Sequence, residues 1–106
     1  MSKYLITASY TADGAKGLLK EGGTKRREAA EQALKSAGAK LDSFYFAFGE
    51  YDAFIIIDAP DHASVAAASV AINASGAVQT RTVVLLTPEE MDQATKRAVT
   101  YRAPGR

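Results

Sequence analysis

Two apolar runs, residues 44–48 and 53–57, form the strongest pattern along the chain. Their aromatic and β-branched side chains favour strands. Gly49 and Glu50 lie between the runs, and a glycine there can adopt the positive φ that a tight hairpin turn requires. The pattern therefore predicts a β-hairpin. Large apolar side chains at consecutive positions point to opposite faces, so both faces of the sheet need cover. On the first strand of this hairpin, Phe44, Phe46 and Phe48 would share one face and Tyr45 would point to the other.

The remaining segments show strand-like alternation or helical periodicity. Alternation predicts two further strands, residues 4–10 and 78–86. Gly14 and Gly17 limit the segment after the first strand to a loop or a single turn. Cap residues followed by apolar stripes predict helices. These helices run from the cap Thr24 to Ala37, from His62 to about Ser75 behind the cap Asp61, and onward from Pro88 behind a capping box of Thr87 and Glu90.

The order of these elements, βαββαβ followed by a terminal helix, is the α+β ferredoxin-like plan. It places an antiparallel sheet under two main helices that lie on one face. The other face stays open although its residues are apolar, so we expect another copy of the chain to cover it in a homo-oligomer. We assign residues 1–98 to a single domain and residues 99–106 to a flexible basic tail.

Composition narrows the classes of function. A chain of 106 residues can bury a core without a metal or disulfide staple. The absence of cysteine excludes disulfides, thiolate metal sites and a cysteine nucleophile, and fits a reducing compartment. A net charge of +1 gives no electrostatic case for nucleic acid or an anionic membrane. No apolar run is long enough to cross a bilayer, and no signal-peptide pattern is present. These features predict a cytoplasmic protein.

Tyr51 and Asp52 follow the predicted turn and are the first candidates for catalytic or ligand-binding residues. Adjacent strand positions point to opposite faces, so with a regular turn Tyr51 shares a face with Ile55 and Asp52 shares one with Phe54. A carboxylate beside an apolar face needs a partner, and Arg81 in the fourth strand is the nearest plausible cation. In the structural interpretation, Asp52 and Arg81 form a satisfied ion pair. In the functional interpretation, Tyr51, Asp52 or both face a ligand, because charged pairs with shifted pKa values also mark functional clefts.

His62 is the only histidine, so any histidine-based acid–base chemistry within one subunit depends on it. Its position behind the cap Asp61 is also typical of a solvent-facing residue in a first helical turn. Asp58, Asp61 and His62 have a spacing that is common at ordinary helix starts. We therefore predict no metal, and no motif indicates a cofactor.

Tyrosines in the strands and a basic cluster complete the candidates. Strand tyrosines usually belong to the core, but a phenol can also orient a flat ligand in an apolar pocket. Five basic residues surround the Gly22–Gly23 pair, where a helix start favours an anion; acidic interruptions favour a solvated surface instead. The ligand-binding candidates are Tyr10, Tyr45, Tyr51, Asp52 and Arg81, the catalytic candidates are Tyr51, Asp52, His62 and Arg81, and the basic cluster is Lys16, Lys20, Lys25, Arg26 and Arg27.

Five segments together resemble the GYD domain family: residues 18–23, 26–29, 44–52, 75–82 and 86–90. The third contains the Gly-x-Tyr-Asp signature as Gly49, Tyr51 and Asp52, and the resemblance covers about residues 3–98. It implies a small bacterial ferredoxin-like domain, similar in plan to the dimeric α/β-barrel proteins, in a family without an assigned activity.

Two functions remain open from the sequence. The first, which we favour, is an oligomeric domain that binds a small apolar or aromatic ligand, or a protein partner. The alternative is a cofactor-free enzyme, similar to monooxygenases or isomerases that use a dimeric α/β-barrel cavity. The sequence therefore leaves open whether the chain is an enzyme.

Overall fold

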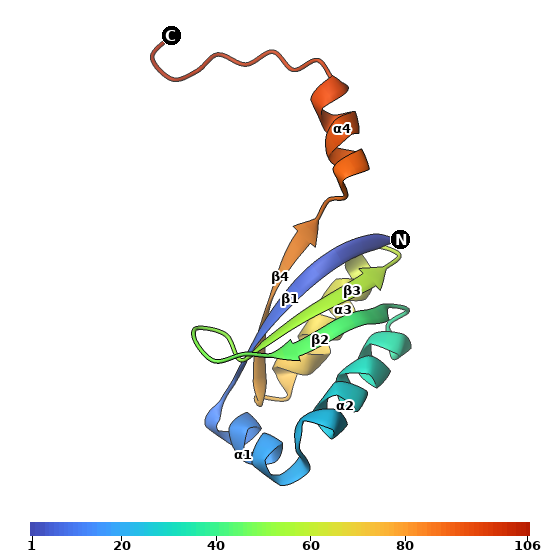
Figure 1. Cartoon of the computed structure of the whole chain (residues 1–106), viewed down its shortest axis with the longest axis vertical. Coiled ribbons are helices and arrows are strands. Elements are labelled where there is room, and N and C mark those ends of the chain that lie inside the picture. Colours follow the sequence, from blue (N-terminus) through green and yellow to red (C-terminus); the bar gives the residue numbers. More distant parts are fainter.

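The computed structural model describes residues 1–106 and contains one antiparallel sheet with the strand order β2-β3-β1-β4 (Figure 1). Both crossover connections return to a parallel strand, and the arrangement is the predicted α+β ferredoxin-like fold. In chain order the elements are β1 (Ser2–Tyr10), α1 (Ala12–Glu21), α2 (Gly23–Ser36), β2 (Lys40–Phe46), β3 (Ala53–Ala59), α3 (His62–Ala74), β4 (Val78–Leu85) and α4 (Pro88–Lys96).

The core lies between the sheet and the helices. Ile6 on β1 pairs with Ile55 on β3 and with Thr82 on β4, so these side chains share the face that α2 and α3 cover. The most deeply buried large side chains on this side are those of Tyr4, Leu34 and Ile57.

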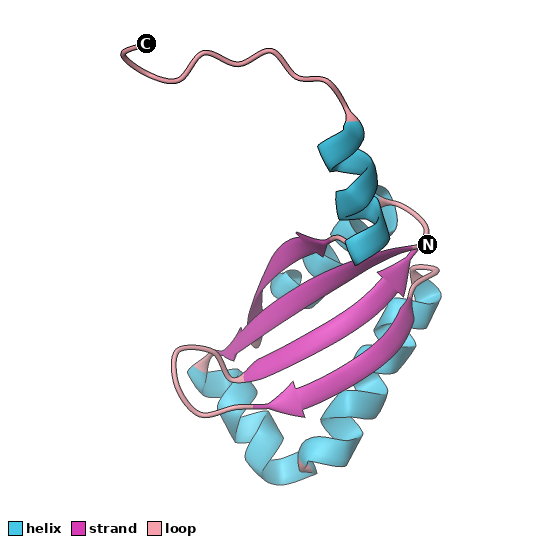
Figure 2. Cartoon of the chain, turned by 45° about the horizontal axis from the view of Figure 1, so that its top comes forward, coloured by secondary structure: helices cyan, strands magenta, loops and turns pink.

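The opposite surface, here called the open face, carries no helix (Figure 2). It remains markedly apolar: Phe54 is 37% exposed and Val83 50% exposed. Its members come from all four strands and follow from the register: Leu5, Thr7, Tyr45, Phe54, Ile56, Arg81 and Val83. The expectation of two apolar faces is therefore confirmed.

Helix α1 occupies the segment where the glycines predicted a loop or a single turn, so that prediction is wrong. Thr11 caps it, since its side chain accepts a hydrogen bond from the backbone N–H of Gly14. The Thr11 N–H also donates to the carbonyl of Ala77 at 3.0 Å. A Cβ atom on Gly14 would overlap that carbonyl oxygen. Gly14 therefore allows the helix to pack closely against the start of β4, and this contact offsets its low helix propensity.

Helix α2 begins at Gly23, with Gly22 as its cap and no side-chain hydrogen bond there. The prediction that Thr24 caps this helix is wrong. Gly22 has φ +83°, which ends α1 and turns the chain directly into α2. A Cβ on Gly23 would lie 2.9 Å from Cε2 of Phe46. Close packing under that ring therefore explains a helix start that side-chain capping rules do not predict.

The β2–β3 connection is longer than the predicted tight turn. β2 ends at Phe46 and β3 begins at Ala53, which leaves residues 47–52 as a loop. Phe48 lies in this loop with its side chain fully exposed, so it does not share the strand face of Phe44 and Phe46. Gly49 has φ +143°, and the predicted positive φ is confirmed.

The predicted caps of the last two helices are confirmed. The Asp61 carboxylate accepts from the Ser64 N–H at 2.8 Å. Thr87 and Glu90 form both hydrogen bonds of a capping box. Helix α4 nevertheless has no buried residue and projects away from the sheet with the C-terminal segment (Figure 1).

The projecting helix and tail make the chain more extended than a compact domain of its size. The radius of gyration of the chain is 16.9 Å. A compact domain of about 100 residues has a radius of gyration of roughly 13 Å. The excess is explained by the segment after β4, because α4 buries none of its residues and projects away from the sheet with the C-terminal segment.

None of the four helices combines the length and the apolar character that a membrane-spanning helix requires.

Candidate functional site

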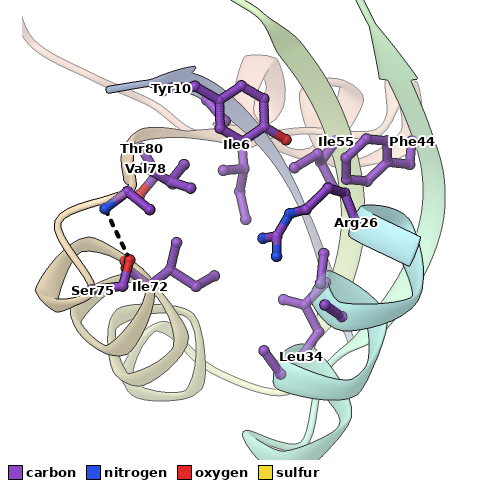
Figure 3. A pocket seen from close by; sticks show the side chains of 15 residues that line it. Ile6, Tyr10, Arg26, Leu34, Phe44, Ile55, Ile72, Ser75, Val78 and Thr80 are labelled. Atoms are coloured by element: carbon purple, nitrogen blue, oxygen red, sulfur yellow. Dashed lines mark hydrogen bonds between the residues drawn. The ribbon is translucent and has the colours of Figure 1, made fainter. Parts of the chain in front are cut away.

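A cavity of about 300 Å³ lies between the sheet and helices α2 and α3 (Figure 3). We call it the helix–sheet cavity. Three alanines of α2, Ala29, Ala30 and Ala33, line it, and larger side chains at these positions would take up part of the space. Apolar residues form most of its wall, notably Ile6, Ala29, Ala30, Ala33, Leu34, Phe44, Ile55, Ile72 and Val78.

Four polar side chains also line this cavity, and two of them are satisfied within the chain. The Ser75 hydroxyl donates to the Ile72 carbonyl and accepts from the Ala77 N–H. The Thr80 hydroxyl accepts from the Asn73 amide at 2.8 Å.

The other two polar groups, the Tyr10 hydroxyl and the Arg26 guanidinium, make no hydrogen bond within the chain. Arg26 extends from α2 into the cavity, and the hydroxyl of Tyr10 lies on the same side (Figure 3). The nearest acid to Arg26 is Glu21, with Nη1 and Oε2 3.8 Å apart. The cavity thus pairs an apolar interior with one polar end.

Tyr10 also borders a second, more open recess. Leu18 on α1, Phe46 on β2 and Phe48 in the β2–β3 loop line this recess together with Tyr10. Asp52 also lies on its rim. Tyr10 therefore stands between the helix–sheet cavity and solvent, and of the predicted ligand-binding residues it alone lines that cavity.

Asp52 closes the β2–β3 loop. Its carboxylate accepts the Tyr10 N–H at 2.8 Å, its own N–H donates to the Ala8 carbonyl, and its carbonyl accepts from the Ala47 N–H. The carboxylate thus supplies the acceptor for the next N–H of β1 after the regular β1–β3 pairing ends at Ala53. These hydrogen bonds give Asp52, the Asp of the Gly-x-Tyr-Asp segment, a structural role in closing the loop.

The predicted faces of Tyr51 and Asp52 are reversed. Tyr51 packs edge-on against Phe54, with ring centroids 5.9 Å apart, on the open face. Asp52 and Arg81 form no ion pair, so the predicted partnership is wrong. The reason is that β3 begins only at Ala53, and strand alternation does not extend back through the loop.

Tyr51 and Arg81 instead share a polar recess at one end of the open face. Thr7, Ser9 and Gln79 complete the wall of this recess together with residues from the β2–β3 loop and α3. Arg81 is exposed there and has no acid within ion-pair distance.

His62 and Tyr45 line neither the helix–sheet cavity nor the polar recess beside Tyr51 and Arg81. His62 Nδ1 is 2.7 Å from the hydroxyl of buried Tyr4, and the rings meet edge-on. Tyr45 is 71% exposed on the outer strand β2. The four predicted catalytic residues therefore occupy three separate places. No group of three His, Cys, Asp or Glu side chains is arranged to hold a metal ion.

Two charged groups near the ends of the sheet have shifted pKa values. Hydrogen bonds to Asp58 and Asp42 raise the pKa of Lys3, because they stabilise the charged amine. The Ser64 N–H lowers the pKa of the Asp61 carboxyl below its usual value of 3.8, because it stabilises the carboxylate. Neither group lines the helix–sheet cavity, so these shifts belong to strand pairing and helix capping.

The fold and its cavity define a small ferredoxin-like α+β domain with a pocket between helices and sheet. The model of the GYD domain family matches residues 4–95. The chain belongs to the GYD domain family. Among curated proteins, none matches the chain.

Sequence reasoning missed Arg26 as a cavity residue. It placed Arg26 in a basic cluster and favoured a solvated surface. Arg27 and Lys25 are indeed exposed, whereas Arg26 is turned inward. The available signal was the helical stripe: Arg26 precedes Ala29, Ala30 and Ala33 at spacings that put these residues on one side of α2.

Proposed function

We propose that this GYD domain binds a small, largely apolar or aromatic molecule in the helix–sheet cavity. The observation that carries the proposal is the cavity itself, which is lined mostly by apolar side chains and offers two unused polar groups. Ligand sites have this composition, with a few polar groups that set orientation. The cavity volume is about 300 Å³. This volume lies at the lower end of the range for ligand pockets and suits a compact molecule.

Native mass spectrometry of the purified protein tests first whether a small molecule is retained. An NMR titration with the neutral aromatic probe hydrocinnamamide then locates binding. We expect amide shifts to change at α2, α3 and the facing strands, because the probe is to lie between them. Shift changes confined to the open face would contradict this location.

A pair of matched variants sharpens the test. Ala33→Leu fills the cavity with a helix-compatible side chain and is expected to weaken probe binding at least about tenfold. Ala67→Leu makes the same change at an exposed position of α3 and is expected to leave binding unchanged. Equal binding by wild type and Ala33→Leu would contradict the proposal.

We also propose that the domain works as a homodimer in which a second copy covers the open face. Apolar residues such as Phe54 and Val83 are substantially exposed there. The same chain projects α4 away from its own sheet, with Met91 49% exposed. A helix as short as α4 is marginal in water without tertiary packing. A twofold partner would supply packing for both elements at once.

Light scattering after size exclusion tests this assembly. We expect a dimer at micromolar concentration for the wild type and for Val70→Glu, which changes an exposed residue of α3. Val83→Glu places a charge on the open face and is expected to give a monomer, because burying that charge in the interface is costly. A wild-type monomer, or a Val83→Glu dimer, would overturn the proposal.

A further inference from the structure

One charged side chain, that of Arg26, lines the helix–sheet cavity, and it makes no hydrogen bond within the chain. Arg26 is the only Asp, Glu, Lys, Arg or His among the residues that line the cavity. The Arg26 side chain is 30% exposed, and the nearby acid Glu21 is 45% exposed, with Nη1 and Oε2 3.8 Å apart. That separation is beyond hydrogen-bond distance. The guanidinium is therefore partly in contact with water, and a ligand that covers it must supply hydrogen bonds in place of that water.

The geometry points to a monocarboxylate as the ligand of this cavity: we infer that its apolar body lies between α2, α3 and the sheet while its carboxylate binds Arg26. This inference rests on the proposed function and names the class of molecule. A planar carboxylate matches the fork of guanidinium donors and forms charge-assisted hydrogen bonds with it.

Tyr10 supplies the second polar contact. Its hydroxyl has no partner in the chain and lies at the Arg26 side of the cavity (Figure 3). A phenol can donate to a carboxylate oxygen that the guanidinium leaves free. Ser75 and Thr80, toward the other side, already have partners, so the cavity has one polar end for one acid group.

The residues that line the cavity also disfavour other classes of ligand. A polyanion such as a nucleotide would bring several charges to a single cation between apolar walls. A cationic ligand would face the guanidinium with no acid lining the cavity. An aromatic or branched aliphatic monoacid satisfies the charge and the apolar walls together.

The test compares carboxylates with their neutral amides. The probes are phenylacetate and phenylacetamide, hydrocinnamate and hydrocinnamamide, and isovalerate and isovaleramide, with dissociation constants from NMR titration at neutral pH. In the wild type we expect the carboxylate of at least one pair to bind about tenfold or more tightly than its amide, as a charge-assisted hydrogen bond requires.

Two neighbouring arginines provide the matched variants. Arg26→Gln should abolish the preference for the carboxylate and leave amide binding within about twofold. Arg27→Gln, an exposed neighbour on α2 outside the cavity wall, should keep the wild-type preference. Thermal melts followed by circular dichroism establish that both variants fold.

The possible failures are distinguishable. If amides bind in the cavity and carboxylates bind no more tightly, or if Arg26→Gln retains the preference, the inference is overturned and the proposed function stands. If no probe of either kind binds in the cavity, both are overturned. Loss of the preference in Arg27→Gln as well would assign it to general surface charge and overturn the role of Arg26.

Discussion

The two faces of the sheet have similar apolar side chains, but the fold covers only one of them. On the helix side Ile55 and Ile57 are 7% and 0% exposed; on the open face Phe54 and Val83 are 37% and 50% exposed. The difference comes from connectivity. The β1–β2 and β3–β4 crossovers start from antiparallel strands and run in opposite directions across the sheet, so a right-handed crossover puts both sets of helices on one face. Composition alone does not distinguish a core face from an interface face.

The comparison also separates packing from binding. The covered face is not filled everywhere, because α2 presents alanines where it crosses the sheet, and the helix–sheet cavity is the result. The open face has no comparable apolar cavity, and its recess beside Tyr51 and Arg81 is polar. We therefore propose ligand binding on the covered side and self-association on the open side.

The largest expected effect contrasts neighbouring isoleucines on the two faces. Ile57, which is fully buried, provides the first variant: Ile57→Ala should lower the free energy of unfolding by about 2–5 kcal/mol, because it leaves a cavity in the core. Ile56→Ala, on the open face, should cost less than about 1.5 kcal/mol at low protein concentration and more as the dimer forms. Urea unfolding at two protein concentrations measures both. Equal, concentration-independent losses would contradict the distinction between the faces.

A second contrast concerns the contact of α1 with the start of β4. A methyl group on Gly14 would overlap the Ala77 carbonyl, whereas one on Gly17, in the same helix, meets no nearby atom. Gly14→Ala should therefore lower the free energy of unfolding by about 1–3 kcal/mol. Gly17→Ala should raise it by about 0.5–1 kcal/mol. Thermal or urea unfolding distinguishes the opposite signs. Two destabilised variants would show that the close approach of Gly14 is not what separates them.

The third contrast uses the adjacent residues Tyr51 and Asp52. The Asp52 carboxylate accepts the Tyr10 N–H, and Asp52→Ala removes this acceptor. The loss should cost about 1–2 kcal/mol, as expected when a hydrogen bond is removed and its donor is left unpaired. The Tyr51 ring contacts Phe54, and Tyr51→Phe keeps that contact while removing a hydroxyl that makes no hydrogen bond within the chain. Its cost should be less than about 0.5 kcal/mol, the usual range for a change that breaks no such feature.

Urea unfolding gives both values, and amide exchange at Tyr10 gives a local readout. We expect faster exchange of that amide in Asp52→Ala and unchanged exchange in Tyr51→Phe. Unchanged protection in Asp52→Ala would argue against the role of the carboxylate in closing the loop.

The smallest effect is the pH dependence contributed by the Asp61 cap. The folded pKa of this carboxyl is lowered, so its stabilising contribution is present above about pH 4 and is lost as pH falls through the folded pKa. Asp61→Asn retains a cap but does not titrate. We expect the two proteins to differ slightly near neutral pH and to converge in acid. The unfolding midpoint as a function of pH measures this, and a difference that widens in acid would have the wrong sign.

The features that were predictable depend on residues close together in sequence. The caps Asp61 and Thr87, the positive φ at Gly49 and the strands predicted at residues 4–10 and 78–86 rest on local patterns, and the structure confirms them. The helix at α1 was not predictable, because what offsets its glycines is a contact with Ala77 in a distant turn.

The candidate site divides in the same way. The sequence pointed to Tyr10 as one of five ligand-binding candidates, and Tyr10 lines the helix–sheet cavity. The other four, Tyr45, Tyr51, Asp52 and Arg81, do not line it. Asp52 bonds to Tyr10 across 42 positions of the chain, and such a partner has no sequence signal. In the sequence Arg26 is one member of a basic cluster, and only the packing of α2 shows that its side chain lines the helix–sheet cavity.

By itself the sequence determined the strands, the main helices, the family and the apolar character of both sheet faces, because propensity, capping and periodicity act over a few residues. Only the tertiary structure decided which face became the core, where the cavity lies and which arginine enters it. These outcomes depend on crossover handedness and on close packing between segments far apart in the chain, and neither is encoded in any local pattern.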